Sequence, residues 1–540
     1  MKKLFLTCAA LVVACAAMAA ECVIIPRPAS YEPQKGKCAL SSKTVVYVAD
    51  KSLVRPATIF CKYVAEEKGL QLNVAEGVAP NKGAITLAVD KLYAEEAYVL
   101  VVAKNGVTIK GGSEQGVFYG LQSLRQVVFH AKAKGEKVEL PCMVVEDKPH
   151  FGYRGGMLDV CRHFFNVDEV KKFIDILALH KMNRFHWHLT EDQGWRIEIK
   201  KYPNLIKVGS MRKETVVGPH HNKPEQVYDG KPHGGYFTQE QVRDIVRYAA
   251  ERYIEVIPEI DMPGHMVAAL ASYPELGCTK GPYEVRTRWG IARDVLCAGR
   301  ESTFEFVEGV LDEVVALFPS KYIHVGGDEC RKHRWKECPD CQKRIADEGL
   351  KDEFELQSYF MKRVEKYLSE KHGRSIIGWD EILEGGLSKT ATVMSWRGTK
   401  GGIKAAQMGN DVVMTPNQFC YLDYANTSDR VKNGEPICGG RNGKRPLTLR
   451  KAYSFDPYAE LNEHERKFIK GVQGNMWTEF VPNFNHVQHM VLPRIAAIAE
   501  VGWTYGEKNY DDFARRMHLL RKLYDKCGFK YAPYFFNGIE

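Results

Sequence analysis

The chain has 540 residues, of which 45% are hydrophobic and 26% are charged. This composition is typical of a globular protein, and the length is sufficient for more than one domain. The formal net charge is +9, and Lys and Arg alternate with Asp and Glu without forming a basic block. The charge pattern therefore argues against nucleic acid as a partner.

Residues 1–20 are typical of an export signal. Residues 1–3 carry positive charge, residues 4–13 are almost entirely apolar, and residues 17–19 offer a small-residue cleavage site. The apolar run is too short to remain as a membrane-spanning helix. Residues 12–15 also resemble a lipoprotein signal, which would leave Cys15 lipidated. We expect an exported protein in the periplasm or at the outer membrane or cell surface, with either a cleaved signal or a lipid anchor.

Residues 22–148 are predicted to form a small α/β domain. Residues 44–48 and 84–89 are rich in β-branched residues and predict strands, and Asn105-Gly106 predicts a hairpin turn. Residues 116–129 place apolar side chains at helical spacing.

From about residue 150 to residue 505, short apolar runs alternate with longer helical patterns, which predicts a (β/α)₈ barrel. Strands are expected at 155–158, 183–189, 254–260, 322–325, 375–379, 392–396, 411–415 and 471–475. Helices are expected between them, for example at 168–180, 239–252, 304–318 and 353–371. Residues 416–470 contain no clear helical pattern. The tail, residues 506–540, is expected to be helical and to pack back on the barrel.

Acidic and aromatic residues follow the predicted strands at the end where barrel enzymes build their sites. They are Asp159, Glu191, Asp192, Asp261, His265, Asp328, Glu329, Trp379, Trp396, Tyr421, Asp423, Trp477 and Glu479, with Arg154 entering the first strand. Any single tryptophan is more often a core residue. The whole set at equivalent strand ends favours a sugar site, because aromatic rings pack on pyranose faces while charged groups bind hydroxyls.

The pair Asp328-Glu329 is the most specific single indication of a catalytic site. Neighbouring side chains on a regular strand point to opposite faces, so both can face one pocket only where the strand has ended. Gly326-Gly327 provides the backbone freedom for this ending. Two adjacent acids repel each other, which raises the pKa of one of them, as a general acid requires.

These motifs resemble those of glycoside hydrolase family 20, the β-N-acetylhexosaminidases. The resemblance covers nearly the whole chain, including the N-terminal α/β domain. It rests on residues 154–159, 185–189, 258–265, 324–329, 378–381 and 474–479. It implies an exo-acting retaining enzyme that removes terminal β-linked N-acetylglucosamine or N-acetylgalactosamine from an oligosaccharide or glycoconjugate, without a cofactor.

The resemblance also implies roles for individual residues. Glu329 would act as general acid and base, Asp328 would orient the substrate acetamide as internal nucleophile, and Tyr421 would donate a hydrogen bond to its carbonyl oxygen. The intermediate would be an oxazolinium ion. The remaining substrate-binding residues would be Arg154, Trp379, Trp396, Asp423, Trp477 and Glu479.

His265 and Glu191 resemble the pair that supports the general acid. Part of the family has Asp at the position of Glu191, so the contact with Glu329 is left open at this point. His186 and His188 lie two residues apart and could be metal ligands, but alternation along a strand favours two inward-facing core residues with Trp187 facing outward.

The cysteines leave two further questions open. The family resemblance suggests a disulfide between Cys278 and Cys297. Cys330, His333, Cys338 and Cys341 have spacings that a zinc site could use. We favour free thiols or a Cys338–Cys341 bridge and expect no metal.

Two other functions compete with the one implied by the resemblance. A lacto-N-biosidase-like enzyme would share the pocket motifs but release a disaccharide. A non-catalytic glycan-binding protein could use the same barrel. The presence of both Asp328 and Glu329 argues against the latter.

Overall fold

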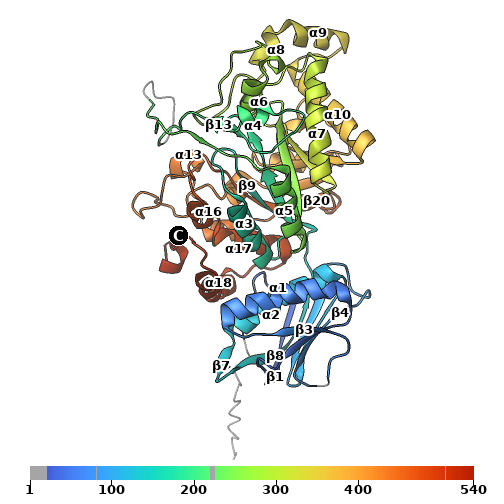
Figure 1. Cartoon of the computed structure of the whole chain (residues 1–540), viewed down its shortest axis with the longest axis vertical. Coiled ribbons are helices and arrows are strands. Elements are labelled where there is room, and N and C mark those ends of the chain that lie inside the picture. The colour runs from blue at the N-terminus through green and yellow to red at the C-terminus, as the bar shows by residue number, and fades with distance from the viewer. Residues whose placement is uncertain (1–20, 81, 219–225, 505, 540) are drawn as a thin grey trace, which may run out of the picture.

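The computed structural model describes residues 21–539 except 81, 219–225 and 505. The predicted export signal and Cys15 lie outside the described residues. Figure 1 shows two units along the longest axis: a smaller one from the N-terminal part of the chain and a larger one built around a barrel.

The N-terminal unit is a mixed eight-stranded sheet with two helices. Its strands run in the order β1-β8-β5-β6-β4-β2-β3, and β7 pairs with β8. Their bounds are β1 (Ser30–Leu40), β2 (Val45–Val48), β3 (Asn73–Glu76), β4 (Ala84–Val89), β5 (Tyr98–Ala103), β6 (Gly106–Gly111), β7 (Lys132–Lys134) and β8 (Lys137–Asp147). The antiparallel pair β5–β6 forms the predicted hairpin.

Helices α1 (Val54–Lys68) and α2 (Glu114–His130) pack together on one face of this sheet. The side chain of Ser113 caps the start of α2. Figure 1 shows both helices on the side that faces the barrel. The ring of Tyr119 in α2 packs edge-on against Trp503 of the larger unit, which joins the two units through a buried contact.

Eight parallel strands close the barrel in the order β10-β15-β16-β17-β18-β19-β20-β9. They are β9 (Tyr153–Asp159), β10 (Arg184–His188), β15 (Glu255–Met262), β16 (Tyr322–Gly326), β17 (Ser375–Trp379), β18 (Thr392–Ser395), β19 (Val412–Met414) and β20 (Ile469–Met476). The predicted fold class is therefore confirmed, and each strand lies where the sequence places it.

The longer helices surround the barrel. They are α3 (Val167–Leu179), α5 (Gln239–Ala250), α7 (Glu301–Leu317), α10 (Glu353–His372), α11 (Lys400–Gln407) and α17 (Arg494–Trp503). Helix α3 begins with a capping box between Asn166 and Glu169. Its residues Val170, Phe173 and Leu177 are fully buried, as their helical spacing predicts.

Short elements fill the connections. They are η1 (Lys51–Leu53), β11 (Thr190–Glu191), β12 (Gly194–Trp195), α4 (Asn204–Lys207), β13 (Met211–Arg212), β14 (His233–Gly234), α6 (Val267–Ser272), η2 (Pro274–Leu276), α8 (His333–Glu337), α9 (Pro339–Asp347), η3 (Asp380–Leu383), α16 (Phe484–Val491) and η4 (Phe535–Asn537). The long connection from β19 to β20 holds α12 (Asn417–Cys420), α13 (Gly440–Gly443), α14 (Leu449–Tyr453) and α15 (Glu463–Arg466).

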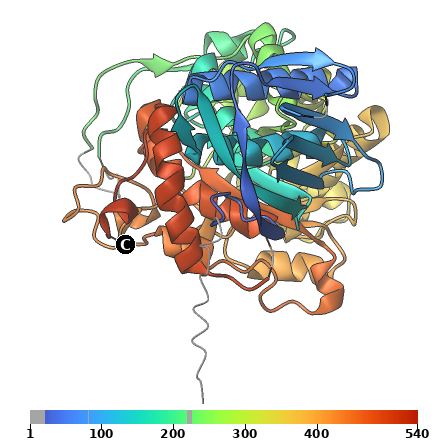
Figure 2. The same ribbon diagram turned by 90° about the horizontal axis from the view of Figure 1, so that it is seen from below.

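Helix α18 (Tyr510–Lys526) contacts both units. Tyr524 hydrogen-bonds His180 at the end of α3, and Arg516 pairs with Glu500 of α17 at 2.7 Å. Arg516 also donates to the carbonyl oxygen of Ile24. Figure 2 shows this red helix running beside the N-terminal unit. Across the described ranges, no helix is both long enough and apolar enough for a bilayer crossing.

Candidate active site

Asp328 and Glu329 lie directly after β16, where two glycines turn the chain. Gly326 and Gly327 have φ values of 64° and 95°, which favour glycine. A Cβ atom on Gly326 would lie 1.8 Å from the Oδ1 atom of Asp261, so a larger residue does not fit. This ending of the strand lets both acids line one pocket.

The pocket at the carboxyl end of the barrel has a volume of about 160 Å³. This is small beside the roughly 300–1,000 Å³ of pockets that hold drug-sized molecules, and it suits one sugar ring. The lining residues are Arg162, Asp328, Glu329, Trp379, Trp396, Tyr421, Asp423, Tyr424, Trp477 and Glu479. Arg162 and Tyr424 are the two members that the sequence analysis missed.

Aromatic rings form the wall of this pocket. Trp379 is almost completely buried, and its ring centre lies 5.7 Å from that of Trp477. Tyr421 stacks with Trp396 at 5.9 Å and lies 6.2 Å from Trp477. Four rings from three strand ends and one following loop thus surround a single small space. Such a wall matches the apolar faces of a pyranose.

Two carboxylate oxygens in the pocket lack a hydrogen-bond donor. Oδ1 of Asp328 and Oδ1 of Asp423 are buried, and no described residue hydrogen-bonds to either atom. Burial raises the pKa of Asp328 to about 6. Burial and the nearby Glu479 raise the pKa of Asp423 well above its usual range. Buried acceptors normally have partners, so these two atoms are suited to N–H and O–H donors of a bound ligand.

His265 lies between the two acids of the pair. Its Nε2 atom is 3.6 Å from Oδ2 of Asp328 and 3.6 Å from Oε2 of Glu329. Although burial opposes it, the negative charges of Glu191 and Asp328 raise the pKa of His265 well above its ordinary value. An imidazolium at this position offsets the repulsion between the two carboxylates.

Glu191 holds both His265 and the unpredicted Arg162. Its Oε1 atom lies 2.7 Å from Nδ1 of His265, and its Oε2 atom lies 2.8 Å from the Arg162 guanidinium. Arg162 also pairs with Asp159 at 3.0 Å and lies 5.0 Å from the ring centre of Trp477. Glu191 thus holds the histidine whose Nε2 atom lies 3.6 Å from Glu329, the contact that the sequence left open.

The prediction that Arg154 binds the sugar is wrong. Arg154 stands at the amino end of β9, opposite the pocket, and only 1% of it is exposed. Its guanidinium pairs with Glu96 of the N-terminal unit at 3.0 Å and donates to Tyr119. Arg162, three residues beyond the end of β9, is the arginine that reaches the pocket.

Beneath the pocket, the carboxylate of Glu259 is surrounded by donors. His186, His188 and His324 lie within 3.0 Å of it, and Nε1 of Trp379 donates to it at 2.8 Å. Burial opposes ionisation of Glu259, but the three histidines hold its pKa well below the usual range. The two histidines of β10 are therefore core residues, and the carboxylate that they hold also fixes the indole of Trp379. Trp187 faces outward onto Phe237 and Phe318.

The predicted disulfide between Cys278 and Cys297 is absent from the structure. Every cysteine in the described ranges is a free thiol, including Cys338 and Cys341. Cys278 and Cys297 instead gather with Cys338 and Cys341 in one cluster away from the pocket, and Cys330 lies outside that cluster. The predicted pair did not include Cys338 and Cys341, which join the cluster from a different barrel loop.

A second cavity, of about 450 Å³, adjoins the pocket and shares Glu329 and Trp396 with it. Lys332, His333, Lys336 and Arg397 are among the other residues that line it. Glu329 therefore stands between a small aromatic pocket and a wider groove. This is the position required of a group that protonates a bond joining two sugar units.

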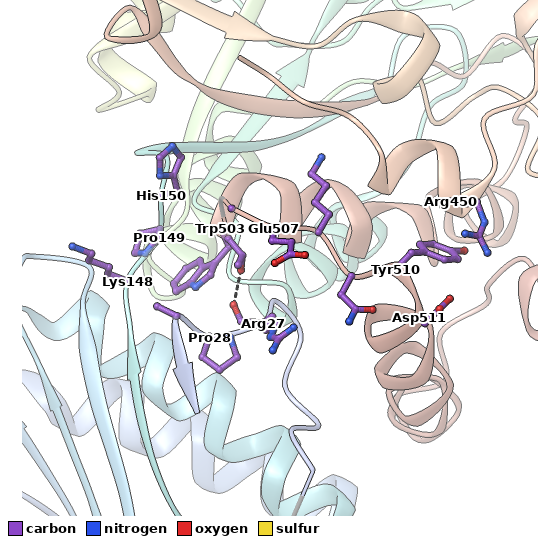
Figure 3. A pocket seen from close by; sticks show the side chains of 15 residues that line it. Arg27, Pro28, Lys148, Pro149, His150, Arg450, Trp503, Glu507, Tyr510 and Asp511 are labelled. Carbon is purple, nitrogen blue, oxygen red and sulfur yellow. Dashed lines mark hydrogen bonds between the residues drawn. The ribbon is translucent and has the colours of Figure 1, made fainter. Parts of the chain in front are cut away.

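Another cavity shares no lining residue with the pocket or with the adjoining cavity. It has a volume of about 1020 Å³, and its lining includes Arg27, residues 148–150 and residues 503, 504 and 506–511. Figure 3 shows it between the N-terminal unit and α18. The hydroxyl of Thr504 donates to the carbonyl oxygen of Arg27 across it. None of the predicted site residues lines it.

The fold and the rim site define a (β/α)₈-barrel protein with a small pocket of acidic and aromatic residues at the carboxyl ends of its strands. The chain matches the catalytic domain of glycosyl hydrolase family 20 over residues 151–505 and domain 2 of that family over residues 21–148. The chain belongs to glycosyl hydrolase family 20.

Named relatives agree with this assignment. The chain is 46% identical over 517 residues to a beta-hexosaminidase of Porphyromonas gingivalis, covering 94% of this chain and 64% of that protein. It thus spans slightly less than two thirds of that relative. It is 35% identical to a beta-hexosaminidase of Akkermansia muciniphila, covering 78% of this chain and 82% of that one. An exo beta-N-acetylglucosaminidase of Vibrio harveyi, solved with N-acetylglucosamine, aligns with a TM-score of 0.82 and 31% identity over 94% of this chain and 78% of that chain.

Proposed function

We propose that the protein is an exo-acting retaining β-N-acetylhexosaminidase that uses the acetamide of its substrate as the nucleophile. The observation that carries this proposal is the buried, donor-free Oδ1 atom of Asp328 beside Glu329 in a one-ring pocket. Relatives named beta-hexosaminidase and a similar structure that holds N-acetylglucosamine support the choice of sugar.

In the first step, Glu329 transfers its proton to the glycosidic oxygen as the bond from C1 to that oxygen breaks. The acetamide oxygen attacks C1 from the opposite face, which forms the oxazolinium ion. Asp328 accepts a hydrogen bond from the acetamide N–H and stabilises the developing positive charge. Tyr421 donates to the acetamide oxygen and orients it. An internal nucleophile held in line supplies about 7–11 kcal/mol of the barrier reduction.

In the second step, water attacks C1 and the bond from C1 to the acetamide oxygen breaks. Glu329 takes a proton from this water and returns to its acid form. Each attack inverts the configuration at C1, so the two successive attacks retain the β configuration. His265, held by Glu191, lies 3.6 Å from Glu329, and its positive charge stabilises the carboxylate form that exists between the two steps.

The shape of the site supports exo action. The pocket of about 160 Å³ accommodates the terminal ring, while the adjoining cavity beyond Glu329 receives the leaving group. Asp423 and Glu479 line the pocket and are placed to accept hydroxyl donors of the terminal sugar. A disaccharide would not fit this pocket. We therefore favour an enzyme that releases single sugars over one that releases a disaccharide.

The test compares p-nitrophenyl β-N-acetylglucosaminide with the matching β-glucoside, which lacks the acetamide. We expect turnover of the first and almost none of the second. Similar rates for both would contradict the role of the acetamide. No turnover of either substrate, together with release of a disaccharide from an oligosaccharide, would support the lacto-N-biosidase-like function instead.

We also propose that the protein is exported, on the pattern of residues 1–19. The mass of the protein recovered from cells tests this. A chain beginning near residue 20 indicates a cleaved signal, and a chain beginning at a lipidated Cys15 indicates an anchor. An intact Met1 would contradict export through this segment.

A further inference from the structure

Four cysteines from two neighbouring barrel loops meet in one cluster, and none of them lines the pocket. Cys278 follows η2 and Cys297 precedes α7, so both belong to the connection between β15 and β16. Cys338 and Cys341 lie at the beginning of α9, in the next connection. The four Sγ atoms all lie within 4.8 Å of one another.

Three of the six sulfur–sulfur distances match the edges of a tetrahedral metal site, and the other three are at most 4.8 Å. Sγ of Cys297 lies 3.8 Å from Sγ of Cys338 and 3.6 Å from that of Cys341, which in turn lies 3.8 Å from Sγ of Cys278. Zinc–sulfur bonds of about 2.3 Å in a tetrahedron place two sulfurs about 3.8 Å apart. A disulfide requires about 2.05 Å. The pair Cys338–Cys341 also has the two-residue spacing common in structural zinc sites.

Backbone contacts within the first loop, and a close approach between the two loops, position the four cysteines. The N–H of Cys297 donates to the carbonyl oxygen of Leu276 at 2.8 Å, and Gly277 pairs with Leu296 in an antiparallel bridge. A Cβ atom on Gly299 would lie 2.2 Å from the carbonyl carbon of Asp340, so only glycine permits this approach to α9. The positions of the thiols are thus set by the fold of both loops.

The surroundings suit a charged metal–thiolate group. Three of the four cysteines are buried, and Cys278 is partly exposed, which leaves a route for entry. Four thiolates and one Zn²⁺ carry a net charge of −2. The guanidinium of Arg300 lies beside them, donating to the carbonyl oxygens of Gly277 and Cys278 and pairing with Asp340 at 2.6 Å.

We propose that Cys278, Cys297, Cys338 and Cys341 bind one Zn²⁺ ion as a structural site. Each thiol releases its proton to solvent as its sulfur binds the metal. Four sulfur ligands complete the tetrahedron and leave no open position for water or substrate, so the site stabilises rather than catalyses. The proposal does not depend on the activity proposed above.

The proposed site would fix the segment that follows Glu329. Cys338 lies nine residues after the acid, and the indole N–H of Trp335 in α8 already donates to the carbonyl oxygen of Leu296 at 2.9 Å. A metal bond at Cys338 and Cys341 would anchor α8 and α9 to the neighbouring loop. Loss of the metal should therefore loosen the groove side of the active site as well as lower stability.

Metal analysis of the full chain, purified without chelator, tests the proposal. We expect about one zinc per chain by elemental mass spectrometry. The double variant Cys338→Ser/Cys341→Ser should contain none, while Cys341→His, which keeps a zinc ligand, should retain it. Cys420→Ser removes a buried thiol outside the cluster and should keep the full zinc content.

Denaturing mass spectrometry separates the alternatives. Absence of zinc together with a mass lower by two hydrogen atoms for each disulfide among the four cysteines would overturn the proposal. Four titratable thiols that still bind no zinc after addition of zinc chloride would overturn it equally. If the double variant does not fold, the wild type still decides: a strong chelator should lower its Tm and added zinc should restore it. A Tm that does not respond to either would contradict the site.

Discussion

Glu191 accepts a hydrogen bond from His265, with Oε1 and Nδ1 2.7 Å apart. The second carboxylate oxygen of Glu191 binds Arg162, so one acid fixes both the histidine behind the catalytic pair and an arginine of the pocket. The longer side chain of glutamate at this position therefore still reaches the histidine.

Replacement of Glu191 by Gln should lower kcat more than it changes KM. The amide keeps the shape but removes the charge that favours the imidazolium form of His265. Loss of one charge-assisted hydrogen bond is worth about 1.5–3 kcal/mol, or roughly a 10–150-fold fall in kcat. The pH dependence of kcat measured for wild type and variant provides the check. Identical profiles would remove Glu191 from the support of the acid pair.

Glu329→Gln should affect substrates according to their leaving groups. An oligosaccharide leaving group needs protonation, so its turnover should fall about 10²–10⁴-fold. A nitrophenyl substrate, whose leaving group needs little help, should lose less in its first step. Steady-state rates on both substrates measure the difference. A variant of near wild-type activity on oligosaccharides would assign the acid to another residue.

The pKa of Asp328 predicts an acid limb in the activity profile. Burial raises this pKa to about 6, and Asp328 must be ionised to accept the acetamide N–H. The value of kcat/KM should therefore fall about tenfold for each pH unit below 6. Asp328→Asn should remove most activity. A wild-type profile flat down to pH 4 would contradict the ionised role of this residue.

The same pKa has an opposite consequence for stability. An aspartate in the unfolded chain releases its proton near pH 3.9, whereas the folded chain holds the proton of Asp328 up to about pH 6. The folded state thus binds more protons in this window, and its stability decreases as pH rises through it. Asp328→Asn should raise the free energy of unfolding at pH 7, with a gain that shrinks toward pH 4. Urea unfolding at both pH values measures this gain.

Arg154 and Arg162 should behave differently when substituted. Arg154→Ala removes the ion-pair partner of the partly buried Glu96, which keeps its hydrogen bonds from Gln115 and Asn183, and should cost about 1–3 kcal/mol of stability, with kcat and KM of the folded fraction nearly unchanged. Arg162→Lys should instead impair catalysis, because lysine cannot bridge Asp159 and Glu191 in the same way. Thermal unfolding and kinetics of both variants, side by side, test whether Arg154 is structural and Arg162 belongs to the pocket.

Much of the site could be predicted because it follows strand ends. Asp328 and Glu329 come after Gly326-Gly327, and the tryptophans end or follow strands, so the topology alone brings them to one rim. The prediction for Arg154 was wrong because Arg154 lies at the amino end of β9. The same rule, applied to the carboxyl end of this strand, predicts Arg162 as the pocket residue.

The cysteine cluster could not be found in this way. Its members come from loops, and the spacing of cysteines along the sequence does not predict that Cys278 and Cys297 lie close to the beginning of α9. The pairing of Cys278 with Cys297 rested on the family resemblance, which gives no information on Cys338 and Cys341. The short helices between β19 and β20 were missed because none is long enough to show a helical period.

The most direct test of the central claim varies the nucleophile itself. Substrates whose acetamide carries one, two or three fluorine atoms have a progressively less nucleophilic carbonyl oxygen, while the leaving group stays the same. If the acetamide oxygen attacks C1, kcat/KM should fall steeply with each fluorine. Rates that do not change across the series would contradict the account, since they would mean that another group forms the bond to C1.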